Sequence, residues 1–254
     1  MLGVAAARDR ASLVTGGVLL AVALAAWATL VLQAEAPMPG SGAAEALVFL
    51  AAWGIMMAAM MLPSATPMIA LYAALRRNAA GNGSVGISTV LFTLVYLAVW
   101  VAFGVPVYVA SLMIGALPAL ADVLPYALAV VLIMAGVYQV TPLKRACLRV
   151  CRSPLSFLWS RPRTGYRGTL ALALEHAAYC VGCCWGLMVV LVVAGAMALN
   201  WVLLIAVVVF VEKLLPRGEL TARVVGGALV VLGVAVAVHP ELAMALHPAA
   251  SMGM

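Results

Sequence analysis

Residues Glu175–Met188, with the sequence EHAAYCVGCCWGLM, combine imidazole and thiol groups in a segment apolar enough to lie in a membrane. If this segment is a helix, His176, Cys180 and Cys183 fall within an arc of roughly 60°. Cys184 lies beside them. Groups that can carry charge or bind a ligand are costly in hydrocarbon, so they indicate a functional site by default. Imidazole and thiolate on one face favour a soft or borderline metal ion.

A second group of soft side chains lies in the run WGIMMAAMMLPSATPM, residues 53–68. Its methionines recur with a spacing of four and form two adjacent rows of thioethers, at Met56 and Met60 and at Met57 and Met61. Pro63 and Pro67 each remove a backbone hydrogen bond, which predicts a kink or an opened turn near Leu62. Methionine also fills gaps in any bundle, so this segment alone favours packing. Beside a Cys/His helix, however, thioether and thiolate form the ligand set that selects Cu(I).

Other residues near the cysteine segment are candidates for supporting the site. A lone cysteine in a membrane helix would only pack, but three in five positions with a histidine one turn earlier are hard to explain by chance. Glu175 points about 100° away from His176, so it is a poor direct partner and instead a proton acceptor, a salt-bridge partner or a ligand from a tilted helix. The candidates for ion coupling or for contacts around the site are Glu175, Glu212, Tyr179 and Met188.

The segment 141–167 is basic and predicted to be a cytoplasmic loop, in which Pro142, Pro154 and Pro162 break any long helix. Cys147 and Cys151 have i,i+4 spacing on a short helix and are candidates for exchanging a metal ion on the cytoplasmic side. The alternative is that this segment only binds anionic lipid headgroups.

The composition predicts an all-α, polytopic transmembrane helix bundle that forms a single domain over residues 1–254. The chain is 67% hydrophobic and 9% charged, whereas soluble domains are about 45–50% apolar and about 25% charged. The net charge of +6 is expected to orient loops rather than to bind nucleic acid. The lipid bilayer is therefore the first expected partner.

Seven apolar segments are predicted to cross the membrane, and the basic residues test this count. If the N-terminus is cytoplasmic, all 14 Lys and Arg residues fall on the cytoplasmic side and the C-terminus lies outside. The expected location is the inner membrane of a bacterium, as a multi-pass protein. The predicted spans are residues 12–32, 44–75, 85–116, 122–140, 168–199, 201–215 and 221–238.

Several long motifs resemble a known family. They are AMMLPSATPM from Ala59, YQVTPLKRACLRVCRSP from Tyr138, EHAAYCVGCCWGLM from Glu175 and EKLLPRG from Glu212. Together they are similar to an uncharacterised bacterial family of predicted metal-binding integral membrane proteins, the domain of unknown function 2182. The resemblance covers the chain from the second predicted span to Arg217. It implies an inner-membrane location and a shared core at Met60, Met61, Pro63, His176, Cys180, Cys183 and Cys184, but no substrate or reaction.

These observations predict a protein that handles Cu(I), as a permease or as a membrane chaperone that delivers copper, rather than an enzyme. A cuproenzyme or a periplasmic metallochaperone is then the candidate protein partner. Two alternatives stay open. The C-x-x-C spacing of Cys180 and Cys183, with Cys184 adjacent, would also suit thiol redox chemistry. The chain could equally be a non-catalytic assembly factor or subunit of a membrane complex, in which these residues only pack.

Overall fold

The computed structural model of this protein describes residues 10–32, 42–80, 82–116, 123–195 and 198–243. All regular secondary structure in these ranges is helical, which confirms the all-α class. In chain order, the helices are α2 (Arg10–Leu32), α3 (Ala43–Ala80), α4 (Asn82–Ala116), α5 (Leu124–Gln139), α6 (Pro142–Arg152), α7 (Pro154–Trp159), α8 (Gly165–Gly195), α9 (Leu199–Leu214) and α10 (Gly218–Val238).

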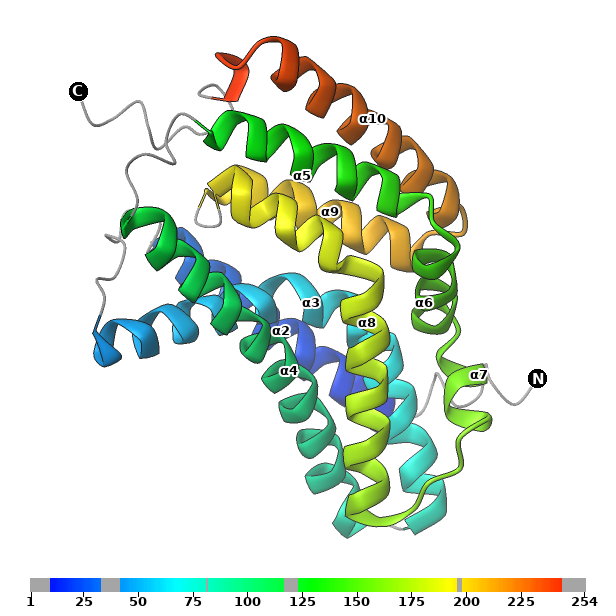
Figure 1. Ribbon diagram of the computed structural model, residues 1–254. Coiled ribbons are helices and arrows are strands. Elements are labelled where there is room, and N and C mark those ends of the chain that lie inside the picture. The colour runs from blue at the N-terminus through cyan, green and yellow to red at the C-terminus, as the bar shows by residue number, and fades with distance from the viewer. Residues whose placement is uncertain (1–9, 33–41, 81, 117–122, 196–197, 244–254) are drawn as a thin grey trace.

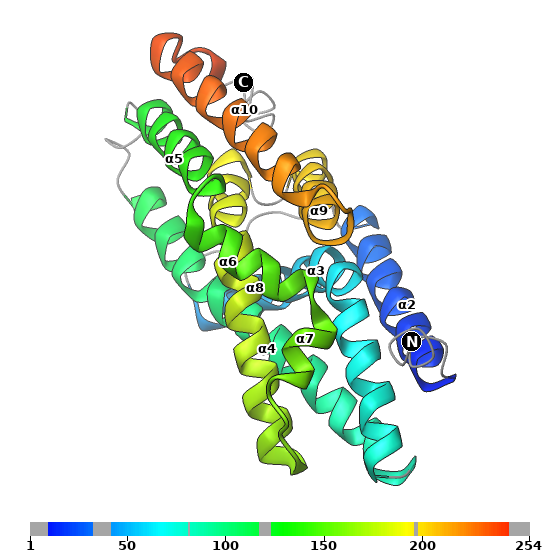
Figure 2. The same ribbon diagram turned by 90° about the vertical axis from the view of Figure 1, so that its right-hand side faces the viewer.

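The helices form two groups that meet at α8 (Figure 1). In one group, α3 packs against both α2 and α4. In the other, α10 packs against both α5 and α9. Helix α8 contacts α4 on one side and α5 and α6 on the other, while α6 and α7 run along its outer side (Figures 1 and 2). The helix with the Cys/His motif therefore lies where the two groups meet.

Among the described residues, five helical segments are long and apolar enough to cross a membrane: 12–32, 43–77, 85–113, 165–194 and 218–238. Helices α5 and α6 are bent by 62° relative to each other and give a sixth span only if they are taken together. Helix α9, which covers most of the predicted span 201–215, has 16 residues, fewer than the about 20 that a span needs. Five or six spans are therefore supported. The count of seven is not confirmed, and the orientation remains a prediction.

Helix α3 is continuous but changes direction along its length, as Figure 1 shows. Pro63 lacks the N–H group that would donate to the carbonyl of Ala59. The Trp27 indole of α2 donates to that carbonyl instead, at 3.1 Å. Ser64 donates to the Met61 carbonyl at 3.0 Å. The backbone group released by Pro63 is thus satisfied by a neighbouring helix, as is required inside a membrane.

Two glycines of the cysteine motif allow α8 to approach α5 and α6 closely. A Cβ atom on Gly182 would lie 2.8 Å from the Cys147 sulfur, and one on Gly186 would lie 3.3 Å from the Tyr138 ring. Tyr138 also donates its hydroxyl hydrogen to the Gly182 carbonyl. Small residues permit such close backbone packing between membrane helices. In this motif, glycine brings α6 and its cysteines against α8.

Candidate metal centre

Four thiols from two helices form a buried cluster, which we call the thiol cluster: Cys180, Cys183 and Cys184 of α8 and Cys151 of α6. The Cys183 sulfur lies 3.3 Å from the Cys184 sulfur and 3.7 Å from the Cys151 sulfur. The Cys180 thiol lies within interaction range of the other three. Each of the three α8 cysteines is 1% exposed. The structure thus joins a cysteine of the basic segment to the cysteines of the apolar motif.

Helix α6, which carries Cys151, is anchored to α5 and α9 by polar contacts. The Thr141 hydroxyl caps its N-terminus by accepting from the Lys144 backbone N–H at 3.3 Å. The Lys144 ammonium pairs with the Glu212 carboxylate of α9 at 2.7 Å, and both side chains are 1% exposed. Gln139 of α5 donates to the other Glu212 oxygen at 3.0 Å and accepts from Lys144. Polar side chains of three helices therefore fix where α6 begins.

Two further helices contribute polar groups that contact the Cys180 sulfur. Lys213 of α9 donates to it at 3.0 Å, and the Tyr96 hydroxyl of α4 lies 3.0 Å from it. The Lys213 ammonium also donates to the Ser64 hydroxyl of α3 at 3.2 Å. Cys180 is thus the point at which α3, α4, α8 and α9 are linked by polar contacts. An ammonium beside a sulfur favours a thiolate, which is the form that binds metals.

The imidazole of His176 lies one helical turn before Cys180 and is 3% exposed. Aromatic rings surround it, with centroids 5.6 Å away at Tyr96, 5.8 Å at Phe157 and 6.1 Å at Phe92. Within the described residues, neither ring nitrogen has a hydrogen-bond partner. Buried polar atoms usually have one, so an unpaired imidazole here needs an explanation such as a bound ion.

The methionines of α3 are buried, and the structure links their helix to α8. The Tyr72 hydroxyl of α3 forms a 2.7 Å hydrogen bond with the Thr169 hydroxyl of α8. Ser64, which bonds to the Met61 carbonyl, also contacts Lys213. A direct hydrogen bond and the Lys213 side chain of α9 therefore connect the two helices required for a mixed thioether and thiolate site. Direct binding of a metal by the thioethers remains a prediction; their side chains are Met56, Met57, Met60 and Met61, each at most 2% exposed.

The remaining predicted residues lie outside the thiol cluster. Glu175 forms ion pairs with Arg161 at 2.5 Å and with Arg163 at 3.4 Å, at a partly exposed position. The Tyr179 hydroxyl accepts from Arg161 at 3.4 Å. Met188 is fully buried in the core. Cys147 contacts Gly182 rather than the cluster sulfurs.

In the part of the chain that the structure describes, no group of three or more His, Cys, Asp or Glu side chains has the arrangement of a metal site. The closest thiol contacts are those of Cys183 with Cys184 and with Cys151. Thiolates bind both Cu(I) and Zn(II). The donor chemistry of the cluster therefore fits a thiophilic metal ion, and the thiols alone do not distinguish these two ions.

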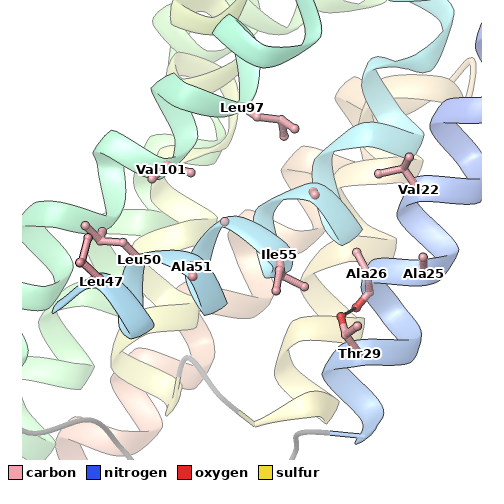
Figure 3. A pocket seen from close by; sticks show the side chains of 12 residues that line it. Val22, Ala25, Ala26, Thr29, Leu47, Leu50, Ala51, Ile55, Leu97 and Val101 are labelled. Carbon is pink, nitrogen blue, oxygen red and sulfur yellow. Dashed lines mark hydrogen bonds between the residues drawn. The ribbon is translucent and has the colours of Figure 1, made fainter. Parts of the chain in front are cut away.

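An apolar groove lies elsewhere on the molecule, between α2, α3 and α4 (Figure 3). Its volume is about 720 Å³, and side chains such as Val22, Leu47 and Leu97 line it. The Thr29 hydroxyl at its edge donates to the Ala26 carbonyl at 2.7 Å. The groove provides no sulfur or imidazole ligand, and α8 does not line it. It is separate from the thiol cluster.

A family model described as PpoB2, copper chaperone, matches residues 50–236. This range includes all the helices that contribute to the thiol cluster. The chain belongs to the PpoB2 copper chaperone family. The copper-related description agrees with the resemblance to metal-binding membrane proteins, although the match does not carry the name domain of unknown function 2182. No curated protein and no solved structure matches the chain.

In this member of the PpoB2 family, residues that the sequence patterns did not single out also lie around the thiol cluster. Lys213 is one of the 14 basic residues expected at the cytoplasmic side, but its ammonium contacts Cys180 inside the bundle. A lysine beside an acid in an apolar run was a usable signal, because ionisable residues in such runs are often functional. No sequence signal indicated Tyr96 or Ser64, since their roles depend on which helices pack together.

Proposed function

We propose that this protein binds Cu(I) in the thiol cluster and delivers it to a partner protein. The observation that carries the proposal is the approach of the Cys151 and Cys183 sulfurs to 3.7 Å from two different helices. Its PpoB2 family description supports copper as the cargo and delivery as the role. The apolar helices support a position within a membrane, for which we propose the bacterial inner membrane.

The cluster suggests how copper is held and released. Thiolates of α8 form the buried side of the site, and Cys151 is a less buried ligand on the separate helix α6. Ligand exchange can therefore begin at Cys151, since loss of one thiolate weakens a site built on few ligands. His176, Met60 and Met61 are proposed as additional ligands. A cuproenzyme or a periplasmic metallochaperone remains the proposed recipient.

Copper content tests this proposal. We expect about one copper ion per chain after anaerobic loading of the detergent-purified protein, bound through deprotonated thiols. Replacement of Cys180, Cys183 and Cys184 together by serine should abolish this binding. Cys147→Ser is the matched control and should retain copper, because Cys147 lies outside the cluster. An unchanged copper content in the triple variant would refute the proposed site.

The distance between Cys151 and Cys183 also favours a second candidate, thiol redox chemistry. Two thiols that form a disulfide release two protons and two electrons, so an acceptor such as a quinone would be required. Alkylation of the purified protein with and without reductant distinguishes the two functions. A reducible disulfide in a protein that binds no copper would favour the redox function. Copper binding with all thiols free would favour delivery.

A further inference from the structure

Lys213 places a buried positive charge directly against the thiol cluster. Its side chain is 7% exposed, and its ammonium lies 3.0 Å from the Cys180 sulfur. In the described part of the chain, no ion pair joins Lys213 to a carboxylate. The adjacent acid, Glu212, pairs with Lys144 instead. The charge of Lys213 is therefore directed at sulfur rather than neutralised by an acid.

Other charged groups near the site are paired or directed elsewhere. The Lys144–Glu212 pair has no net charge. Glu175 binds two arginines at a partly exposed position on α8. Among the described residues, Lys213 is the one charged side chain with a hydrogen bond to a cluster thiol. It therefore places a positive charge directly at the Cys180 sulfur.

We propose that Lys213 makes the thiol cluster selective for monovalent soft ions over divalent ions. This inference rests on the proposed function, because it requires that the cluster binds a metal. Two thiolates with Cu(I) carry one net negative charge, which the ammonium balances. The same ligands with Zn(II) carry no net charge, and the ammonium is then left uncompensated. Uncompensated charge is costly in a low-dielectric interior, so the cluster disfavours the divalent ion.

The net charge of the occupied site depends on how many thiolates bind, but the sign of the Lys213 contribution does not. For any fixed set of ligands, exchange of a monovalent ion for a divalent ion adds one positive charge close to the Lys213 ammonium. The repulsion between these charges is strong where water is excluded. The Ser64 hydroxyl accepts from the same ammonium at 3.2 Å and helps to hold it at the sulfur. Lys213 is therefore a specificity-determining residue placed by α9 and α3.

The test compares the affinities of the detergent-purified full chain for Cu(I) and for Zn(II), each measured by competition with a chelator. Lys213→Met should lower the ratio of Cu(I) to Zn(II) affinity by about tenfold or more, within the range known for groups that support metal ligands. Lys213→Arg keeps the charge and should keep the preference. Ser64→Asp retains the lysine but supplies a carboxylate to pair with it, so it should also lower the ratio.

The outcomes separate this inference from the proposed function. If Lys213→Met and Ser64→Asp bind both ions with the wild-type ratio, Lys213 does not set selectivity, although copper delivery would stand. An equal loss of affinity for both ions would likewise show a purely structural role and overturn the inference. If Lys213→Met fails to fold, the ratio in Ser64→Asp decides. If the wild-type protein binds no Cu(I), both the proposed function and the inference fail.

Discussion

Replacement of Lys144 by methionine should strongly destabilise the protein. Lys144 and Glu212 are each 1% exposed and lie 2.7 Å apart, so the substitution leaves a carboxylate buried without its cation. Removal of one partner of a buried ion pair typically costs about 3–5 kcal/mol. For a chain of this size, each kcal/mol lowers the melting temperature by about 2–4 °C, so we expect a decrease of roughly 6–20 °C. Thermal unfolding of the detergent-purified protein measures this decrease in melting temperature.

Two further variants make this prediction specific to the pair. Lys144→Met combined with Glu212→Gln removes both charges and should recover most of the lost stability, because no unpaired charge remains. Arg149→Met, on the exposed side of the same helix, should change the stability by at most about 0.5 kcal/mol. The reasoning is refuted if Lys144→Met is no less stable than Arg149→Met. It is also refuted if the double variant loses as much stability as Lys144→Met and Glu212→Gln lose together.

Two other predictions concern packing and use the same unfolding assay. Gly226→Ala should cost about 1–3 kcal/mol, since its Cβ would lie 2.8 Å from a backbone carbonyl of α5. Gly227→Ala, whose Cβ would have nothing within 4 Å, should not destabilise the protein, because alanine favours a helix more than glycine does. Equal melting temperatures for these two variants would contradict this close packing of α5 and α10. Tyr72→Phe removes the 2.7 Å hydrogen bond to Thr169 and should cost about 0.5–1.5 kcal/mol. A Phe variant as stable as the wild type would show that this bond does not hold α3 to α8.

The helical class and part of the site could be predicted from local patterns. Apolar composition predicted a bundle of helices able to cross a membrane, because backbone groups in lipid must be satisfied within the chain. Pro63 predicted the disturbance in α3, because a missing N–H leaves a carbonyl free wherever the helix lies. Helical periodicity placed Cys180 and Cys183 on one face, and the structure brings both into the thiol cluster.

The other features of the site depend on how segments far apart in the chain pack together. The spacing of residues within one segment does not encode this packing. Cys151 reaches the cluster because Gly182 allows a close approach and because Lys144 is buried against Glu212 rather than solvated with the other basic residues. Lys213 was counted with the charges that orient the protein in the membrane, although it lies within the bundle. The predicted count of seven spans is not confirmed for a related reason, since a short apolar helix and a membrane span have the same composition.

The affinity for Cu(I) of two serine variants in α6, one helical turn apart, tests most directly whether the copper site spans α6 and α8. Cys151→Ser removes a thiol 3.7 Å from Cys183 and should weaken Cu(I) binding by about tenfold or more in competition with a chelator. Cys147→Ser removes a thiol outside the cluster and should leave the affinity unchanged. Equal affinities in the two variants, or a greater loss in Cys147→Ser, would contradict a copper site built from both helices.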